Sequence, residues 1–384
     1  MSFLLLLITI QSGNAGLYHA SGEETITGEE TLACSQCHTM HGTQGGQSLI
    51  YGGAAAVYPK LLRASSILNL CLYCHQDNSA GMTNPTPPDI WNNTLGYIPS
   101  GGDFAHLNYT NERNRHSVGT DVSTTPPPGA DTAVVDWSGV TTRYGTTFNC
   151  LYCHDQHGNK NYRNLRYDPG NPANDTEAAG LKISYSLDGG TCSTGETPPC
   201  DIDNTTSATD NLVKYYRSNV KFYKPSATDY NRLAQWCGKC HTKFFGPSGD
   251  TNLGGVAAAG VGAGDNNTGS PWVRHPVGDI NITIAGNNLH ADTATWLDTA
   301  MTGRPRYVEP DSYATATIDG NEQPFCLSCH YAHGGGNPNY ATDPTLDHSN
   351  LVYVDSAGNI NMDSASYDKT TGMLRNTCQK CHNQ

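Results

Sequence analysis

The sequence contains few of the residues from which hydrophobic cores are usually built. Only 36% of its 384 residues are hydrophobic, whereas Gly and Pro contribute 41 and 21 residues. A chain of this length ordinarily forms two or three domains, each around an apolar core made by amphipathic elements. Little of that periodicity is present, and the stretches 124–129, 246–270 and 334–344 are typical of turns and loops. The sequence therefore argues against ordinary side-chain cores as the main source of stability.

Basic residues are also scarce. There are 22 Lys and Arg against 35 Asp and Glu, which gives a formal net charge of −13 with His neutral. A negative surface repels nucleic acid and offers no basic patch to bind it. The charge balance thus predicts that nucleic acid is not a partner.

Long apolar runs are absent as well. Phe3–Ile10 is too short to span a bilayer and fits the apolar part of a signal peptide, with Gly13 and Ala15 suitable for cleavage. Residues 1–15 are therefore predicted to be a signal-like segment, although the missing basic n-region leaves the true start codon open. No later stretch reaches membrane-span length. We expect a secreted protein, extracellular or at the cell surface, without a membrane span.

What the sequence has in excess is a cysteine motif. Cys-x-x-Cys-His occurs six times, whereas the composition alone would give about 0.02 copies. This motif attaches haem c covalently, because two thiols bond the porphyrin edge and the following His ligates the iron. In motifs one to six, the attaching cysteines are Cys34 and Cys37, Cys71 and Cys74, Cys150 and Cys153, Cys237 and Cys240, Cys326 and Cys329, and Cys378 and Cys381. The proximal iron ligands are His38, His75, His154, His241, His330 and His382.

Other uses of paired cysteines fit this pattern less well. A zinc ribbon does not require a His directly after the second Cys. A thioredoxin-type redox pair occurs once, near a βαβ pattern. Cys192 and Cys200 lie outside the six motifs, and for them we expect a local disulfide in an oxidising compartment, with an idle pair as the alternative.

Six haems change the expectation for the fold. They supply the buried apolar area that the side chains lack, at roughly 64 residues of chain for each haem. A Gly- and Pro-rich chain without its haem would be disordered. We predict mostly irregular coil with short helices and little sheet, wrapped around a row of six c-type haems. Residues 16–384 are expected to form a single hexahaem unit.

The six irons also need distal ligands, and nine His lie outside the attachment motifs. Three of them, His41, His157 and His333, stand three residues after a proximal His in the longer pattern Cys-x-x-Cys-His-x-x-His-Gly. One helical turn separates the two His, so the second lies on the proximal side of its own haem. If it ligates iron, that iron must belong to a different haem packed close by.

A second repeat supplies two further candidates. Arg-His-x-Val-Gly occurs around His116 and His275, each time after an even-numbered motif. The chain is thus predicted to contain modules spanning 34–119, 150–278 and 326–384, of which the last ends without this element. The sixth distal ligand must then come from His19, His106, His290 or His348. We favour His19, which lies just before the first motif and would be free to act on the terminal haem of the row or on a neighbouring molecule.

Several segments around the motifs match a known family. They are Leu17–Gly22 with the first motif, Gly101–Phe104, the third motif, Trp236 with the fourth motif, Arg274–Pro276 and the fifth motif. On these residues the chain resembles the OmcS-type cytochromes, which are secreted hexahaem proteins that polymerise into conductive extracellular filaments. The resemblance covers the order of all six motifs, whereas the loops between them look unrelated.

The resemblance implies a particular arrangement. Every iron in that family is bis-His, and the haems alternate between parallel-stacked and T-shaped pairs. The family's His that matches His41 ligates a haem of the adjacent subunit, which joins subunits by coordination bonds. The chain also departs from the family. Phe244 and Phe245 stand where the family can carry another His, no His occurs in 291–325, and His348 has no obvious counterpart.

The predicted function is long-range electron transfer, without bond chemistry at any iron. The partners expected are copies of the chain itself, together with redox partners or extracellular electron acceptors. A discrete carrier that never polymerises is one alternative. A multihaem nitrite or hydroxylamine oxidoreductase is another, but nine spare His face six vacancies and no atypical motif such as Cys-x-x-Cys-Lys marks one haem as different. We therefore expect an electron-transfer protein and not an enzyme.

Overall fold

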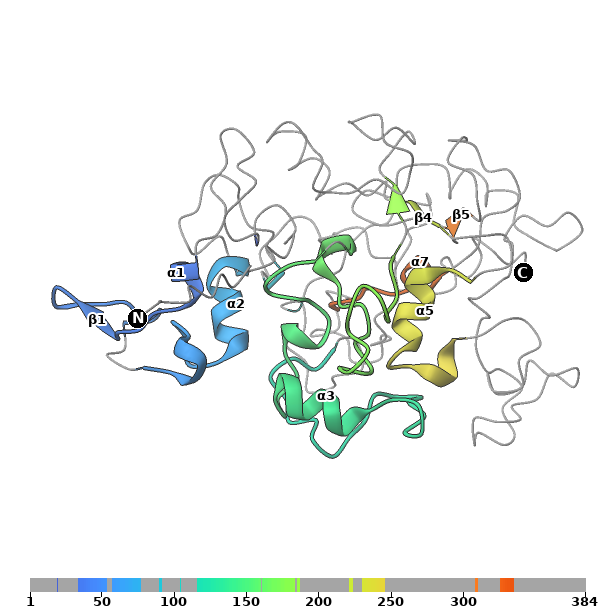
Figure 1. Cartoon of the computed structure of the whole chain (residues 1–384), viewed down its shortest axis with the longest axis horizontal. Helices are drawn as coiled ribbons and strands as arrows, with labels where there is room; N and C mark the ends of the chain where they lie inside the picture. The colour runs from blue at the N-terminus through green and yellow to red at the C-terminus, as the bar shows by residue number, and fades with distance from the viewer. Residues whose placement is uncertain are drawn as a thin grey trace, which may run out of the picture.

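Irregular coil predominates in the computed structural model (Figure 1). The structure describes residues 19, 34–53, 57–76, 90–91, 104, 116–159, 161–183, 185–186, 221–223, 230–245, 308–309 and 325–334. Within these ranges the longest helix has nine residues and the longest strand three. The prediction of mostly coil with short helices and little sheet is confirmed.

The regular elements follow one another in short pieces. The helices are α1 (Cys34–Cys37), η1 (Pro59–Leu61), α2 (Ile67–His75), α3 (Trp137–Tyr144), η3 (Cys150–Tyr152), η4 (Tyr162–Asn164), α5 (Arg232–Gly238), η5 (Thr242–Phe244) and α7 (Cys326–Cys329). The strands are β1 (Thr43–Gln44), β2 (Gln47–Ser48), β3 (Tyr185–Ser186), β4 (Lys221–Tyr223) and β5 (Val308–Glu309). Each of the five described haem motifs has its first Cys in a helix. These helices are α1, α2, η3, α5 and α7.

The sheets are small. β1 and β2 form an antiparallel hairpin in which Thr43 pairs with Ser48. In the second sheet, with order β3-β4-β5, β4 pairs antiparallel with β3 and parallel with β5. Its Phe222 pairs with Val308, which brings together segments far apart in the sequence. These strands join separate loops by short ladders of hydrogen bonds. They do not form a layer against which helices could pack.

The motif-bearing helices lie across the molecule in chain order. In Figure 1, α1 and α2 lie at one side of the view and α5 with α7 toward the other, while α3, which precedes motif three and carries no motif itself, lies between them. α2 contacts η3, and α5 contacts α7, so successive haem motifs are neighbours in space. This order places the attachment sites in a row.

Side-chain cores are small and lie beside the motifs. One cluster contains Tyr162, Ile183, Leu233, Ala234 and Phe325, and it joins the segments that carry motifs four and five. A second cluster surrounds α3, and a third joins Phe104 to Val118. Because each described cluster contacts a motif, the apolar side chains support the attachment sites locally.

Polar caps start the helices that carry or support the motifs. The Ser66 hydroxyl accepts a hydrogen bond from the Asn69 N–H at 3.1 Å and so begins α2. Asp136 caps α3 in the same manner through Gly139, at 2.9 Å. Gly145 ends α3 at φ 98°, a backbone conformation that glycine adopts without a Cβ clash. Such caps allow helices of seven to nine residues to form.

Several predicted features lie outside the described residues. They are the signal-like segment 1–15, the disulfide candidates Cys192 and Cys200, the ligand candidate His275, and the whole sixth motif with Cys378, Cys381 and His382. In the part of the chain that the structure describes, no helix is long and apolar enough to cross a membrane.

Candidate haem-binding site

Each haem motif folds as a single helical turn. The backbone N–H of the proximal His donates to the carbonyl of the first Cys, at 2.9 Å in motifs one, three and five and at 3.0 Å in motif four. Motif two ends α2 and is helical throughout. Positions one, four and five of such a turn share a face. The two thiols and the imidazole of one motif can therefore address the same porphyrin.

Cysteines of successive motifs lie in contact. A hydrogen bond from Cys150, followed by burial, raises the pKa of Cys71. The corresponding contact with Cys326 raises the pKa of Cys237. Burial also raises the pKa of Cys153 to about 12. Before haem is attached, Cys71, Cys153 and Cys237 are thus neutral thiols near pH 7. Among the described residues, no three or more metal-binding side chains form a group, as a zinc site would need.

Three pairs of His face each other at a common spacing. The ring centres are 6.2 Å apart for His19 and His75, 6.1 Å for His116 and His241, and 6.2 Å for His154 and His333. A bond between a metal and an imidazole nitrogen is about 2 Å long, so two His on one metal have ring centres about 6 Å apart. Each pair joins one proximal His to one predicted distal His. The residues present therefore fit an axially ligated haem iron.

Backbone carbonyls fix the orientation of the imidazoles. The Nδ1 atoms of His154 and His241 lie 2.9 Å and 2.8 Å from the carbonyl oxygens of Arg163 and Pro128. The same contact is made by His38 with Lys60 at 3.0 Å, by His116 with Ala332 at 2.5 Å, and by His19 with Gln156 at 3.4 Å. A protonated Nδ1 donates to such an oxygen and leaves Nε2 as the electron-pair donor. These five imidazoles are thus held in the form that a metal requires.

Burial keeps three of these imidazoles neutral. Desolvation is the largest cause that lowers the pKa of His19, His154 and His241 to about 4. The pKa of His116 is lowered for the same reason. The charged form of a buried imidazole is disfavoured. Because only a neutral imidazole can ligate iron, the surroundings of these rings favour ligation.

The His three residues after a proximal His differ in their surroundings. His333 lies opposite His154 of motif three rather than beside its own His330, and its ring also stacks on Phe104 at 4.9 Å. His41 and His157 are exposed. The side chain of His157 is 3.3 Å from Gln156, whose carbonyl faces His19.

The remaining predicted residues are placed as follows. His19 lies beside motif two of its own chain rather than at the end of the row. His38 and His330 belong to none of the three pairs above, although the charge of His330 influences His241. The backbone of Cys329 ends α7, but its side chain is not among those that the structure describes.

Similarity to known proteins adds independent evidence. No family model matches the chain. C-type cytochrome OmcS from Geobacter sulfurreducens is 28% identical over an alignment of 415 positions. The alignment covers 91% of this chain and 92% of that protein. The chain resembles an OmcS-type cytochrome. The prediction of that family from the motifs is confirmed.

Two solved structures are similar to this chain. The outer membrane cytochrome S filament from Geobacter sulfurreducens gives a TM-score of 0.49 at 18% identity and covers 90% of this chain and 98% of the other. A structure of the OmcS nanowires from the same organism gives 0.41 at 20% identity, over 91% and 98%. The sequence similarity to OmcS, together with the attachment motifs, implies covalently bound haem in this chain.

Sequence reasoning missed the groups that hold the imidazoles. Pro128, Gln156 and Ala332 act through main-chain carbonyls, which leave no mark in the side-chain pattern. Lys60 and Arg163 also act through carbonyls, but they belong to a short repeated pattern. Comparison of the segments that follow motifs one and three would have found it.

Proposed function

We propose that this chain transfers electrons through six covalently attached bis-His haems c and is the repeating subunit of an extracellular filament. The observation that carries the proposal is the spacing of the three His pairs, 6.1 to 6.2 Å between ring centres. In each pair the proximal His of one motif faces a His from a different part of the chain: His19 from before the first motif, His116 from the Arg-His-x-Val-Gly repeat, and His333 from the fifth motif. In a chain folded in this way, the two ligands of one iron come from separate segments, which holds neighbouring haems close together.

The proposed ligand set uses all twelve predicted His. His19 pairs with His75, His116 with His241, and His154 with His333. The other three proximal residues, His38, His330 and His382, take their partners from His41, His157 and His275. The twelve motif cysteines hold the porphyrins, from Cys34 and Cys37 to Cys378 and Cys381. We propose this set from the geometry of the three described pairs and from the three remaining His that belong to a repeated motif.

When bound, haem supplies reversible one-electron chemistry at a potential set by ligands and burial. The chain provides position. Its single-turn motifs present two thiols and an imidazole to one side, and its carbonyls orient the imidazoles. Contacts between Cys71 and Cys150, and between Cys237 and Cys326, keep successive attachment sites close. Close and fixed spacing is what electron transfer needs.

The same geometry opposes an enzymatic function. An enzyme of the nitrite or hydroxylamine type needs an iron with an exchangeable position. In each described pair, His occupies both sides of the space between the rings. Neither side is left for a substrate, which favours an electron-transfer protein.

Assembly into a filament is supported by the surface near the first motif. His41 is exposed, and the adjacent Met40 exposes 74% of its surface. Val57 and Leu61 expose 59% and 45%, and the Leu61 carbonyl accepts from the Thr39 N–H. Exposed apolar side chains around a candidate ligand fit a contact with a second copy of the chain. OmcS, the similar protein, is known from a filament structure.

One experiment on the secreted protein tests the proposal. Peptide mass mapping should find haem on all six motifs, and the oxidised protein should show only six-coordinate, low-spin spectra. A high-spin haem that binds nitrite or CO readily would favour an enzyme instead. Electron microscopy of the same sample should show unbranched filaments, whereas dispersed particles would favour a discrete carrier.

A further inference from the structure

A four-residue pattern recurs after motifs one and three. Lys60–Arg63 reads Lys-Leu-Leu-Arg and Arg163–Arg166 reads Arg-Asn-Leu-Arg, so both follow [Lys/Arg]-x-Leu-Arg. In both copies the first two residues have positive φ, between 51° and 60°. That conformation is unfavourable for Lys60, Leu61 and Arg163, whereas Asn164 tolerates it better. Its occurrence at the same two positions of both copies indicates that surrounding contacts enforce it.

The two copies make the same main-chain contacts. The carbonyl of the first residue, Lys60 or Arg163, accepts from Nδ1 of the proximal His of the preceding motif. The N–H of the last residue donates to the carbonyl of that motif's second Cys, at 3.0 Å from Arg63 and 2.8 Å from Arg166. The leucine forms an isolated β-bridge with the proximal His in each case. Each pattern thus lies alongside its haem motif like a short strand.

The two arginine side chains also bind equivalent atoms. Arg63 donates from Nη1 to the carbonyl of Ser35 at 3.0 Å, and Arg166 donates from Nε to the carbonyl of Leu151. Ser35 and Leu151 are the residues directly after the first Cys of their motifs. Each arginine therefore holds its motif at two carbonyls, one near the first Cys and one at the second.

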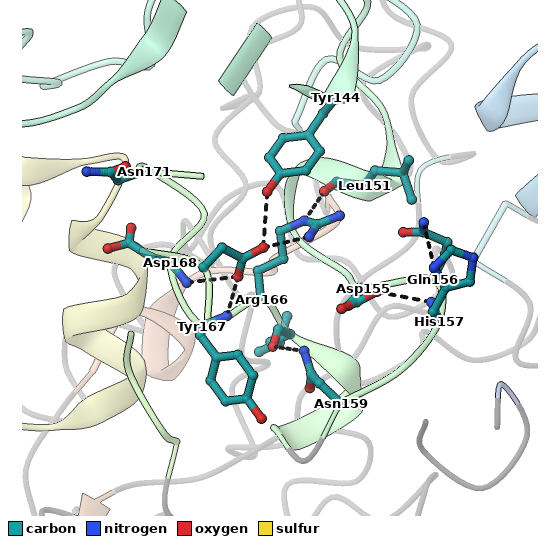
Figure 2. A network of polar contacts seen from close by, with 12 residues as sticks. Tyr144, Leu151, Asp155, Gln156, His157, Asn159, Arg166, Tyr167, Asp168 and Asn171 are labelled. Carbon is teal, nitrogen blue, oxygen red and sulfur yellow. Dashed lines mark hydrogen bonds and ion pairs between the residues drawn. The ribbon is translucent and has the colours of Figure 1, made fainter. Parts of the chain in front are cut away.

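Each guanidinium also stacks on a tyrosine ring. Arg63 lies over the ring of Tyr51 at 4.4 Å, and Arg166 lies over the ring of Tyr144 at 4.0 Å. Arg166 also forms a buried ion pair with Asp175 at 2.7 Å. Figure 2 shows this guanidinium with its contacts to Leu151 and to the carboxylate that Tyr144 also reaches. The arginines are thus held in one orientation.

The loops that lead to the two copies differ in length. The first residue of the pattern lies 22 positions after the proximal His in motif one and nine positions after it in motif three. Equal contacts at unequal loop lengths mean that the contacts are not a by-product of one local turn. Motif four uses a different device, because its His241 meets the carbonyl of Pro128, 113 residues away.

We propose that Arg63 and Arg166 are positioning residues for the haems of motifs one and three. Each arginine clamps the attachment loop so that the carbonyl three residues earlier sets the plane of His38 or His154. This inference rests on the proposed function, since it concerns how attached haems are oriented. Lysine cannot replace arginine here, because a single ammonium lacks the planar fork that reaches a carbonyl while stacking on an aromatic ring.

The test uses Arg63→Lys and Arg166→Lys in the full secreted protein. The matched control is Arg143→Lys. Arg143 is exposed, its guanidinium lies 5.9 Å from the centre of the Tyr144 ring, and it makes no hydrogen bond to a motif among the described contacts. Lysine retains the charge beside Asp175 and so limits the loss of folding. Haem attachment is measured by peptide mass mapping, and the orientation of axial imidazoles by the electron paramagnetic resonance spectrum of the oxidised protein.

We expect each clamp variant to shift one low-spin component, a different one in each, while the control spectrum matches the wild type. Selective loss of haem from motif one or motif three in the corresponding variant would support the proposal equally. Clamp variants with wild-type spectra and six haems would overturn it, as would loss of haem from all motifs in both variants. A wild-type protein without six low-spin haems would instead contradict the proposed function.

Discussion

At the scale of single residues, the hydrogen bonds at Nδ1 decide which nitrogen of each imidazole is available to iron. His19, His38, His116, His154 and His241 all direct Nδ1 to a carbonyl. All of these carbonyls belong to the main chain, and we propose that two of them, those of Lys60 and Arg163, are held in place by Arg63 and Arg166. The tautomer of the ligand is therefore set by the path of the main chain, and a side-chain substitution near a carbonyl should be tolerated unless it moves the backbone.

His19 gives the clearest test of a ligand assignment. We expect His19→Ala to retain six attached haems, because the cysteines of motif two are intact, but to leave the iron at His75 with one axial ligand. About one haem in six should then become high-spin and bind CO. Absorption spectra with and without CO measure this change.

The matched control for that variant is His290→Ala. His290 was an alternative source of the sixth ligand, lies outside the described residues, and should give a wild-type spectrum on substitution. If the high-spin haem arises in His290→Ala and not in His19→Ala, the pairing of His19 with His75 is wrong.

At the scale of elements, the helices depend on caps because they are too short to be stable alone. Asn231 caps α5, whose last two residues begin motif four. Its Oδ1 accepts from the Ala234 N–H at 2.7 Å. Its Nδ2 is buried without a hydrogen-bond partner among the described residues. The cap therefore combines a favourable hydrogen bond at Oδ1 with an unpaired, buried donor at Nδ2.

Two substitutions separate these contributions. Asn231→Ala removes the acceptor and should lower the free energy of unfolding by about 1 kcal/mol. Asn231→Ser retains an acceptor and removes the unpaired donor, so it should be more stable than the Ala variant. Thermal unfolding followed by circular dichroism gives the ranking, with haem content as the control. Equal midpoints for the two variants would show that the cap contributes nothing.

The elements also show how far the sequence could predict the fold. The single-turn conformation of the motifs follows from their ligand chemistry, and coil elsewhere follows from Gly and Pro. The pairing of His116 with His241 was not predictable, because it depends on how distant loops meet. The pattern at Arg63 and Arg166 is short and lies at unequal distances from its motifs. A comparison of the two segments finds the pattern, but only its contacts show what it does.

Similar limits apply to the links between motifs. Lys239 lies inside motif four and pairs with Asp168 at 2.8 Å, while the Trp236 indole donates to the Arg166 carbonyl at 2.6 Å. The segment that clamps motif three thus also contacts motif four. Long-range contacts of this kind are fixed by packing and have no local sequence pattern. They join the elements into one row of sites.

At the scale of the whole molecule, an exposed ligand candidate distinguishes a polymer from a discrete carrier. His41 is exposed beside Met40, whereas His333 of the equivalent position is held between Phe104 and His154. Among the described residues His41 faces no proximal His, so its imidazole is available to another chain. The proposed filament therefore requires His41 in a way that a carrier does not.

We expect His41→Ala to carry six haems, to form no filaments and to contain one high-spin haem, because one iron loses a ligand that another subunit supplies. His157→Ala is the control from the same type of motif. It should also contain one high-spin haem, because His157 is a proposed distal ligand. It should still form filaments, because we propose that His157 ligates an iron of its own chain. Electron microscopy and absorption spectra of both secreted variants measure these outcomes. Filaments from His41→Ala would rule out His41 as the ligand that joins subunits, because coordination across the interface cannot survive the loss of its imidazole.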